Sequence, residues 1–336
     1  MTEATKPQRV KWYRSPVPRE DLKRLNRRSD LKGAAQTLGY VGLLGVTAAA
    51  AVLSVGRLHW ALVVPIFYVH GMCYHFLING FHELVHDSVF KTRWLNRFFL
   101  RVFSFLGMHN HHEFWASHTE HHKYTLHPPQ DLEVVLPMPI TLRGFLQTAF
   151  VCPWAMAWKL RKFARHATGR LEGRWEHHLF DQNPVERRKM FNWARFVLVG
   201  HAGVFAIGAA TGVWALPVVV TLANFYGGGL FYLCNNSQHA GLKDNAPDFR
   251  LCCRTLYLNP FFRFLYWHMN YHTEHHMYAA VPCYNLGKLH RIIKDDLPPC
   301  PRGLYETWKQ IVEVKRKQKE DPDYRYEAEL PVPRAA

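Results

Sequence analysis

The chain has 336 residues, of which 48% are hydrophobic and 14% aromatic, and it carries a formal net charge of +16. Seven cysteines are scattered and form no C-x-x-C pair, which excludes the usual thiolate zinc and iron–sulfur patterns and favours free thiols in a reducing compartment. Basic charge also suits nucleic acid, but no nucleic-acid motif appears, and we expect no nucleic-acid partner.

Long apolar runs predict membrane spans. The runs at 33–56 and 58–81 contain no Asp, Glu, Lys or Arg, and 196–236 is long enough for two helices. A bilayer core needs about 20 apolar residues per helix. The expected fold is therefore an all-α integral membrane protein with two helical hairpins and four spans, at about 34–55, 59–81, 194–212 and 213–234. The apolar stretch at 140–158 is interrupted by charge and proline, and we expect it to lie on the membrane surface.

Charge predicts the orientation of these spans. The first 32 residues hold ten Lys or Arg and four Asp or Glu, whereas the turns between the paired spans carry almost no charge. By the positive-inside rule both termini are cytoplasmic. This divides the chain into a basic segment (1–33), a membrane domain (34–300) and a charged cytoplasmic tail (301–336). We see no cleavable signal peptide and no endoplasmic-reticulum retrieval signal in 332–336, and we predict a bacterial inner membrane.

Histidine is the anomaly of the composition. The chain has 22 histidines, and the pentapeptide HTEHH occurs at both 118–122 and 272–276. With histidine scattered at random, H-x-x-H-H would be expected roughly 0.1 times. Two further clusters, His82-Glu-Leu-Val-His86 and Asn235-Asn-Ser-Gln-His239, follow the ends of the predicted second and fourth spans. All four clusters then lie on the cytoplasmic face and can meet in space.

The spacing of these histidines indicates metal binding. On a helix, residues i, i+3 and i+4 share a face, so H-x-x-H-H presents its first and last imidazole together and directs the middle one aside. Nine clustered imidazoles exceed what one tetrahedral zinc can use, and imidazole also suits iron, copper and nickel. A position below apolar helices favours a redox metal acting on an apolar substrate.

The four clusters resemble the histidine boxes of the membrane fatty acid desaturase/hydroxylase superfamily. GFHELVHDSVF, FWASHTEHHKYTLHP and YWHMNYHTEHHMYAAVPCYNL look like the three boxes, and NNSQHAG looks like the segment that supplies one more ligand. The resemblance covers about 35–300. It implies two iron ions with O2 as co-substrate, held in a cytoplasmic helical cap by nine ligands: His82, His86, His118, His121, His122, His239, His272, His275 and His276.

The resemblance also implies supporting residues and partners. Asn235 is expected to hold a metal-bound water, while Glu120, Glu274 and Asp131 are candidates to orient ligating histidines through the other ring nitrogen. The implied reaction abstracts hydrogen from an unactivated C–H bond of a lipid or acyl substrate. Because no haem-binding His-Pro-Gly-Gly and no ferredoxin cysteine run occur, we expect a separate electron donor of the ferredoxin or cytochrome b5 type.

Other functions remain open on the sequence. Desaturation of a fatty acyl chain is the favoured reaction, but a hydroxylase or ketolase acting on a lipid or small metabolite would use the same boxes. His82-Glu83-Leu-Val-His86 also matches H-E-x-x-H, the zinc metalloprotease motif with Glu83 as general base. That reading leaves both HTEHH copies unused. A histidine-rich metal transporter would place its ligands within the spans or in low-complexity tracts, which differs from the pattern here.

Overall fold

The structure, a computed structural model, describes residues 9–331, and in that range it contains helices and no β-strand. Residues 1–8 of the predicted basic segment lie outside the described residues. So do residues 332–336, in which a retrieval signal was sought. The first half of the chain forms α1 (Arg19–Leu25), α2 (Asp30–Ser54), α3 (Trp60–Tyr74), α4 (Leu77–Val85), α5 (Arg93–Leu106), α6 (His111–Tyr124), α7 (Leu142–Ala149) and α8 (Pro153–Ala167). The second half forms α9 (Gly173–Phe180), α10 (Pro184–Thr211), α11 (Ala215–Val220), η1 (Leu222–Phe225), α12 (Gly229–Asn236), α13 (Phe249–Cys252), α14 (Pro260–Leu265), α15 (His272–Met277), α16 (Cys283–Ile293), η2 (Lys294–Asp296) and α17 (Leu304–Lys317).

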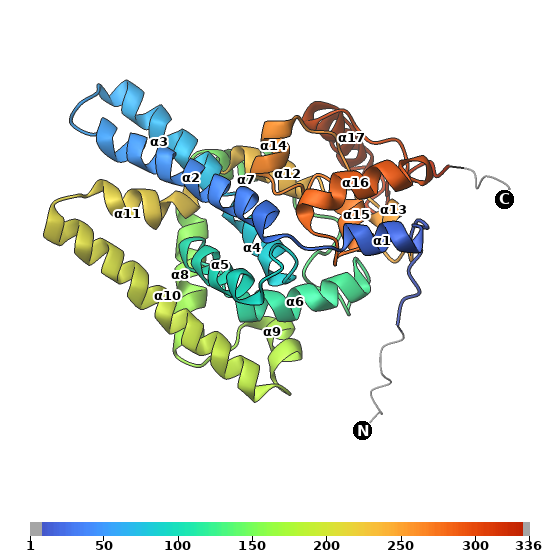
Figure 1. Cartoon of the computed structure of the whole chain (residues 1–336), viewed down its shortest axis with the longest axis horizontal. Coiled ribbons are helices and arrows are strands. Elements are labelled where there is room, and N and C mark those ends of the chain that lie inside the picture. The colour runs from blue at the N-terminus through green and yellow to red at the C-terminus, as the bar shows by residue number, and fades with distance from the viewer. Residues whose placement is uncertain (1–8, 332–336) are drawn as a thin grey trace.

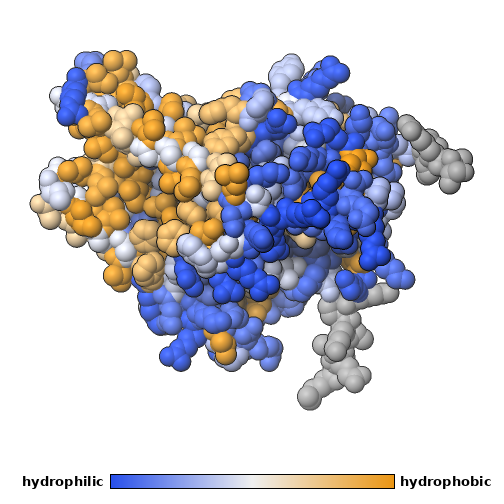
Figure 2. Space-filling view, viewed as in Figure 1, coloured by the Kyte–Doolittle hydropathy of each residue, from blue (hydrophilic) through white to orange (hydrophobic). Residues whose placement is uncertain are grey.

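Three helical segments of the described chain are long and apolar enough to cross a membrane. They are α2, the nearly continuous α3–α4 at Trp60–Val85, and α10. At about 1.5 Å per residue, each exceeds the roughly 30 Å of a bilayer core. In Figure 1 α2, α3, α10 and α11 project to one side, with α1 and α13–α17 on the other. Figure 2 shows apolar side chains gathered on that same projecting end, whereas the opposite end is hydrophilic.

The expected fourth span at 213–234 differs from the prediction. It forms the short helices α11, η1 and α12, with a break at Tyr226–Gly228. Gly227 has a φ of +76°, and its backbone N–H donates to the Phe150 carbonyl at 2.9 Å. A Cβ there would lie 2.8 Å from the backbone nitrogen of Met72 and the carbonyl oxygen of Tyr68 in α3. Glycine therefore lets the chain turn against α3, which an unbroken helix could not do.

The segment expected on the membrane surface forms two helices, α7 and α8. Leu142, Phe150, Trp154 and Trp158 are exposed along it, at 72%, 62%, 72% and 58%. Exposed apolar and aromatic side chains of this kind are typical of a helix at a membrane interface. The loop between α7 and α8 also pairs through its backbone with the break before α12, at Val151 and Tyr226.

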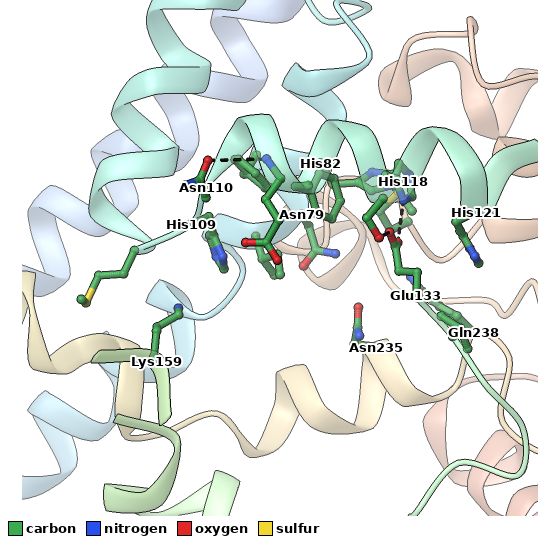
Figure 3. Close-up of a pocket in the computed structure, with 18 of the residues that line it drawn as sticks. Asn79, His82, His109, Asn110, His118, His121, Glu133, Lys159, Asn235 and Gln238 are labelled. Carbon is green, nitrogen blue, oxygen red and sulfur yellow. Dashed lines mark hydrogen bonds and ion pairs between the residues drawn. The ribbon is translucent and has the colours of Figure 1, made fainter. Parts of the chain in front are cut away.

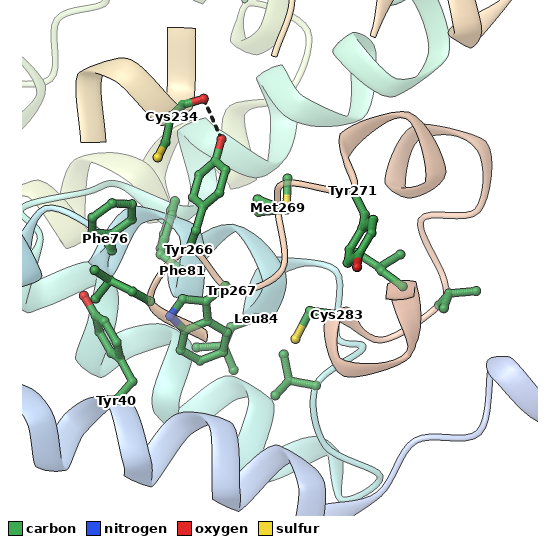
Figure 4. Close-up of a cluster of buried hydrophobic side chains, with 14 of the residues drawn as sticks. Tyr40, Phe76, Phe81, Leu84, Cys234, Tyr266, Trp267, Met269, Tyr271 and Cys283 are labelled. Atoms are coloured by element: carbon green, nitrogen blue, oxygen red, sulfur yellow. Dashed lines mark hydrogen bonds between the residues drawn. The ribbon is translucent and has the colours of Figure 1, made fainter. Parts of the chain in front are cut away.

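A buried aromatic core joins the histidine-bearing segments (Figure 4). Trp267, just before the second HTEHH, packs edge-on against Phe103 with ring centroids 5.6 Å apart. A Cβ on Gly80 of α4 would lie 2.6 Å from the Trp267 ring, so glycine is needed for this close approach. The Tyr266 hydroxyl donates to the Cys234 carbonyl of α12 at 2.9 Å. These contacts hold α4, α12 and the loop before α15 in fixed relation.

Candidate metal centre

Two helices present the HTEHH pentapeptides. The first lies in α6, whose start is capped by the Asn110 side chain accepting from the Glu113 N–H at 3.5 Å. The second forms α15, a buried helix of six residues. Residues i and i+4 of a helix lie one above the other, so His118 pairs with His122 and His272 with His276. The Nε2 atoms are 2.9 Å apart in the first pair and 3.1 Å apart in the second.

Five imidazoles form a first cluster, which we call cluster A: His82, His86, His118, His122 and His275. Each offers a ring nitrogen, and these five atoms all lie within 4.8 Å of one another. The His275 and His122 Nε2 atoms are 3.2 Å apart, although the residues are 153 positions apart in the chain. Within residues 9–331, the buried Nε2 of His86 has no hydrogen-bond partner. A cluster of ring nitrogens converging in this way suits an imidazole-binding metal.

A second group, cluster B, contains His239, His272 and His276, with the Cys253 thiol also within 4.8 Å. The His272 and His239 Nε2 atoms are 2.9 Å apart. His121 lies beside this cluster, its ring centroid 5.0 Å from that of His276. Burial and the neighbouring Cys252 raise the pKa of the Cys253 thiol well above its ordinary value. A thiol that stays protonated is a poor metal ligand, so histidine is the suitable donor of this group.

Each HTEHH pentapeptide serves both clusters. The first gives His118 and His122 to cluster A and directs His121 toward cluster B, whereas the second gives His272 and His276 to cluster B and His275 to cluster A. The structure therefore brings together all nine predicted histidines, eight as members of the clusters and His121 beside one. It also shows the middle imidazole of each pentapeptide directed away from its two neighbours.

The Nδ1 atoms of several histidines are held by carboxylate acceptors that are buried or half-buried. His121 pairs with Asp131 and His118 with Glu133, both at 2.8 Å, while His82 pairs with Glu83 at 3.2 Å. Acceptors on the other ring nitrogen fix the tautomer and orientation of metal-binding imidazoles. Asp131 was expected in this position from the sequence. Glu133 was not, although it lies in the same loop, two residues after Asp131.

Two predicted carboxylates do not contact a clustered histidine. Glu120 lies on the surface of α6 and pairs with Lys123 at 2.7 Å. Glu274 is fully buried, but its carboxylate binds the Thr255 hydroxyl and His290. Asn235 lies on α12 at the wall of the adjoining pocket, where Figure 3 shows it facing the side that carries His82 and His118.

Burial controls the protonation of the clusters. It lowers the pKa of His86 to about 4 and that of His239 to about 3. For His118, His122, His272 and His276, burial and the neighbouring imidazoles lower the pKa well below its ordinary value. Burial also opposes protonation of His121, but Asp131 outweighs it and raises the pKa. Neutral imidazoles are the form that binds metals.

A pocket of about 380 Å³ adjoins both clusters (Figure 3). His82, His118 and His239 line one part of it, and Lys159 lies at the end away from them. The Lys159 ammonium donates to the Gly107 carbonyl at 2.8 Å, and burial lowers its pKa to about 7. The pocket is thus apolar for most of its surface with a polar end, a form typical of small-molecule sites.

Beside that polar end, Glu113, His166 and Glu176 form a third group of possible metal ligands. Here the Lys162 ammonium already lies between the two carboxylates, paired with Glu113 and 3.2 Å from Glu176. The His166 Nε2–H donates to the second carboxylate oxygen of Glu176 at 2.9 Å. A lysine in the centre supplies the positive charge that a cation would otherwise bring, so this group is explained as a buried ion-pair network.

The described residues form an all-helical protein with helices apolar enough to span a membrane and a histidine-rich candidate metal site. Residues 58–308 match the model of the fatty acid desaturase family, and the chain belongs to that family. It is also 25% identical over 262 residues to a sphingolipid delta(4)-desaturase DES1-like protein of Arabidopsis thaliana, a match that covers 75% of this chain and 69% of the relative. Membership supports an oxidoreductase with a lipid substrate at a membrane.

Proposed function

We propose that this protein is an O2-dependent di-iron enzyme that desaturates a fatty acyl chain with electrons from a separate donor. The observation that carries the proposal is the pair of imidazole clusters at the wall of one pocket. The two clusters suit two metal ions better than one, and the chain belongs to a family of oxidoreductases. The H-E-x-x-H motif fits this site better than a zinc protease. Glu83, the general base in the protease reading, is buried behind His82 and lies 3.6 Å from the Nδ1 of His275.

The proposed ligands follow the clusters. Cluster A would hold one iron through five imidazoles, and His121 with the three histidines of cluster B would hold the other. Two iron ions bound there would supply O2 activation and hydrogen abstraction from an unactivated C–H bond. Asn235, on the pocket wall facing the side of His82 and His118 (Figure 3), is placed to hydrogen-bond a water or substrate in the pocket.

The chain's own residues would bind and orient the substrate. The pocket lies between α4 and α6 on one side and α8 and α12 on the other, and buried apolar residues such as Phe81 and Met108 exclude water from it. Lys159 and Asn110 at its polar end favour a lipid whose polar group enters the pocket and fixes which carbon faces the imidazoles. A hydroxylase would need the same positioning, and the product of the reaction distinguishes the two.

The proposed arrangement in the membrane places the clusters in a cytoplasmic cap below the spans, with the donor docking on the basic cytoplasmic face. Support comes from the three apolar helices and from the net charge of +16. We expect no turnover with NAD(P)H when the purified chain is the sole protein. Turnover under that condition would show that the donor is built in.

The test is mass spectrometry of lipids and small metabolites from cells that express the chain with a ferredoxin and its reductase. We expect acyl chains lighter by two hydrogens, with the double bond located by fragmentation. Products heavier by one oxygen, with unchanged acyl chains, would replace desaturation by hydroxylation.

His122→Ala and His276→Ala remove one ligand from cluster A and one from cluster B. Each is expected to abolish product formation and to lower the iron content measured on the purified protein, because ligands of both clusters are required together. Full activity in either variant would disprove the two-cluster site.

A further inference from the structure

A second hollow of about 510 Å³ lies between α7, α12 and α17. It shares no lining residue with the pocket beside the histidine clusters. α12 separates the two, because Tyr232 and Leu233 line the second hollow whereas Asn235 and Gln238 line the first. We call the second hollow the α17 groove.

The walls of the α17 groove are mostly apolar and aromatic. Phe145, Tyr232 and Trp308 form a row, with ring centroids 5.7 Å apart in the first pair and 6.2 Å apart in the second. The Trp308 indole N–H donates to the Leu233 carbonyl at 3.0 Å, which fixes the position of this ring in the wall of the groove. Leu142 and Val312 at the edge are exposed, at 72% and 45%.

Positive charge continues this apolar wall along α17. The groove is lined by Trp308, Ile311, Val312, Lys315, Arg316 and Lys319. The five that belong to α17 recur at a spacing of three and four residues and so share one face of the helix, and Lys319 lies in the turn that follows it. The apolar members come first and the basic members after them. The α17 acids lie elsewhere, since Glu313 pairs with Lys317 and Glu306 accepts from the Arg302 N–H. The run Lys315–Lys319, which composition alone presents as a solvated charged face, thus lines a groove.

We propose that the α17 groove binds an anionic phospholipid, with an acyl chain against Trp308 and Ile311 and the phosphate at Lys315, Arg316 and Lys319. Three cations without a carboxylate among the groove residues match one phosphate-bearing headgroup. The apolar part continues into the exposed face of α7, where lipid would be present. An acidic protein would need a docking face of about 800 Å², whereas a hollow of this size suits a chain-like ligand.

The test uses the purified full-length chain in detergent and quenching of tryptophan fluorescence by bromine-labelled phosphatidylglycerol. Trp308→Phe removes the reporter in the groove, and the difference between it and the parent isolates quenching at Trp308. We expect quenching at Trp308 to saturate as brominated phosphatidylglycerol is added. The apparent affinity for brominated phosphatidylcholine should be at least tenfold weaker.

A triple variant, Lys315→Gln/Arg316→Gln/Lys319→Gln, is expected to weaken phosphatidylglycerol binding at least tenfold, because each basic residue near an anionic headgroup contributes a factor of roughly five. The matched control, Arg302→Gln/Lys309→Gln/Lys317→Gln, removes the same charge from residues outside the groove and should bind as the parent does. Neither triple variant changes a histidine or a residue of the first pocket.

Three results would overturn the proposal. Equal loss in both triple variants would show general charge attraction, and equal affinity for the two headgroups would show that the cations do not select phosphate. Absence of quenching at Trp308 would show that lipid does not enter the groove. If an acidic ferredoxin then bound the parent and not the first triple variant, the three basic residues would be assigned to a protein partner. If the first triple variant does not fold, the headgroup comparison and Trp308→Phe still decide the question.

Discussion

Two glutamates near the first HTEHH differ in what they touch. Glu133 accepts from the Nδ1 of His118 at 2.8 Å and from the Ser117 hydroxyl at 2.6 Å, whereas Glu120 pairs with Lys123 on the helix surface. Loss of an acceptor behind a metal-binding imidazole typically lowers metal affinity 10–100-fold. We therefore expect Glu133→Ala to bind the proposed iron about 10–100-fold more weakly than the parent in a chelator titration.

Glu120→Ala is the matched control, since it removes the same carboxylate from the same neighbourhood without touching a ring nitrogen. It should retain iron as the parent does. Equal retention in both variants would show that the orientation of His118 does not depend on Glu133.

Lys159 gives a prediction about pH. Burial, aided by the nearby Lys162, lowers its pKa in the folded protein to about 7. In the unfolded chain the amine stays protonated to about pH 10, so between these values the unfolded state binds more protons and the free energy of unfolding rises with pH. The slope is at most about 1.4 kcal/mol per pH unit.

Melting temperatures in detergent from pH 7 to 9 test this. The parent should gain stability relative to Lys159→Met as pH rises, whereas Lys309→Met, which changes an exposed lysine, should follow the parent. Parallel curves for the parent and Lys159→Met would mean that the amine remains charged in the folded protein.

At the scale of elements, the break before α12 depends on glycine. Gly227 and Gly212 both have positive φ, at +76° and +72°, but a Cβ would meet backbone atoms of α3 at Gly227 and open space at Gly212. Gly212→Ala should lose about 1 kcal/mol from the left-handed conformation. Gly227→Ala should lose about 1–3 kcal/mol more from overlap.

Thermal unfolding of the two variants, side by side in one detergent, gives the comparison. Gly227→Ala should melt below Gly212→Ala. The reverse order would mean that the approach of this segment to α3 is relaxed without cost.

For the whole molecule, the N-terminal segment lies with the C-terminal helices. The Asn285 side chain of α16 donates to the Leu25 carbonyl at 2.8 Å, and the Tyr13 N–H donates to the Pro247 carbonyl at 2.9 Å. Both ends of the described chain are thus on the same side of the apolar helices. With the basic N-terminal residues setting the orientation, we predict that both are cytoplasmic.

Reporter fusions in a bacterial host check the orientation. Green fluorescent protein at either terminus should fluoresce, and alkaline phosphatase at either terminus should be inactive. An active phosphatase at one end only would place the two ends on opposite sides and contradict the packing of α1 on α16.

Sequence patterns were enough to predict the helical class, three of the four expected spans and the nine histidines that the fold brings together. Hydrophobic runs and i, i+4 spacing are local properties, and a local pattern is enough to predict them. The family resemblance drawn from the boxes is confirmed by the match over 58–308. Asp131, which follows the first HTEHH pentapeptide, was also among the carboxylates proposed from the sequence, and it accepts from the Nδ1 of His121.

The arrangement of the site follows from contacts between segments that are distant in the sequence. Nothing local indicates that His275 joins His122 across 153 positions, or that Glu133 and not Glu120 supports His118. The expected fourth span is a broken segment because Gly227 packs against α3. Hydropathy carries no information about that contact. Likewise, composition predicts a solvated charged face for Lys315, Arg316 and Lys319. Only the position of α7 and α12 beside α17 shows that these residues line a groove.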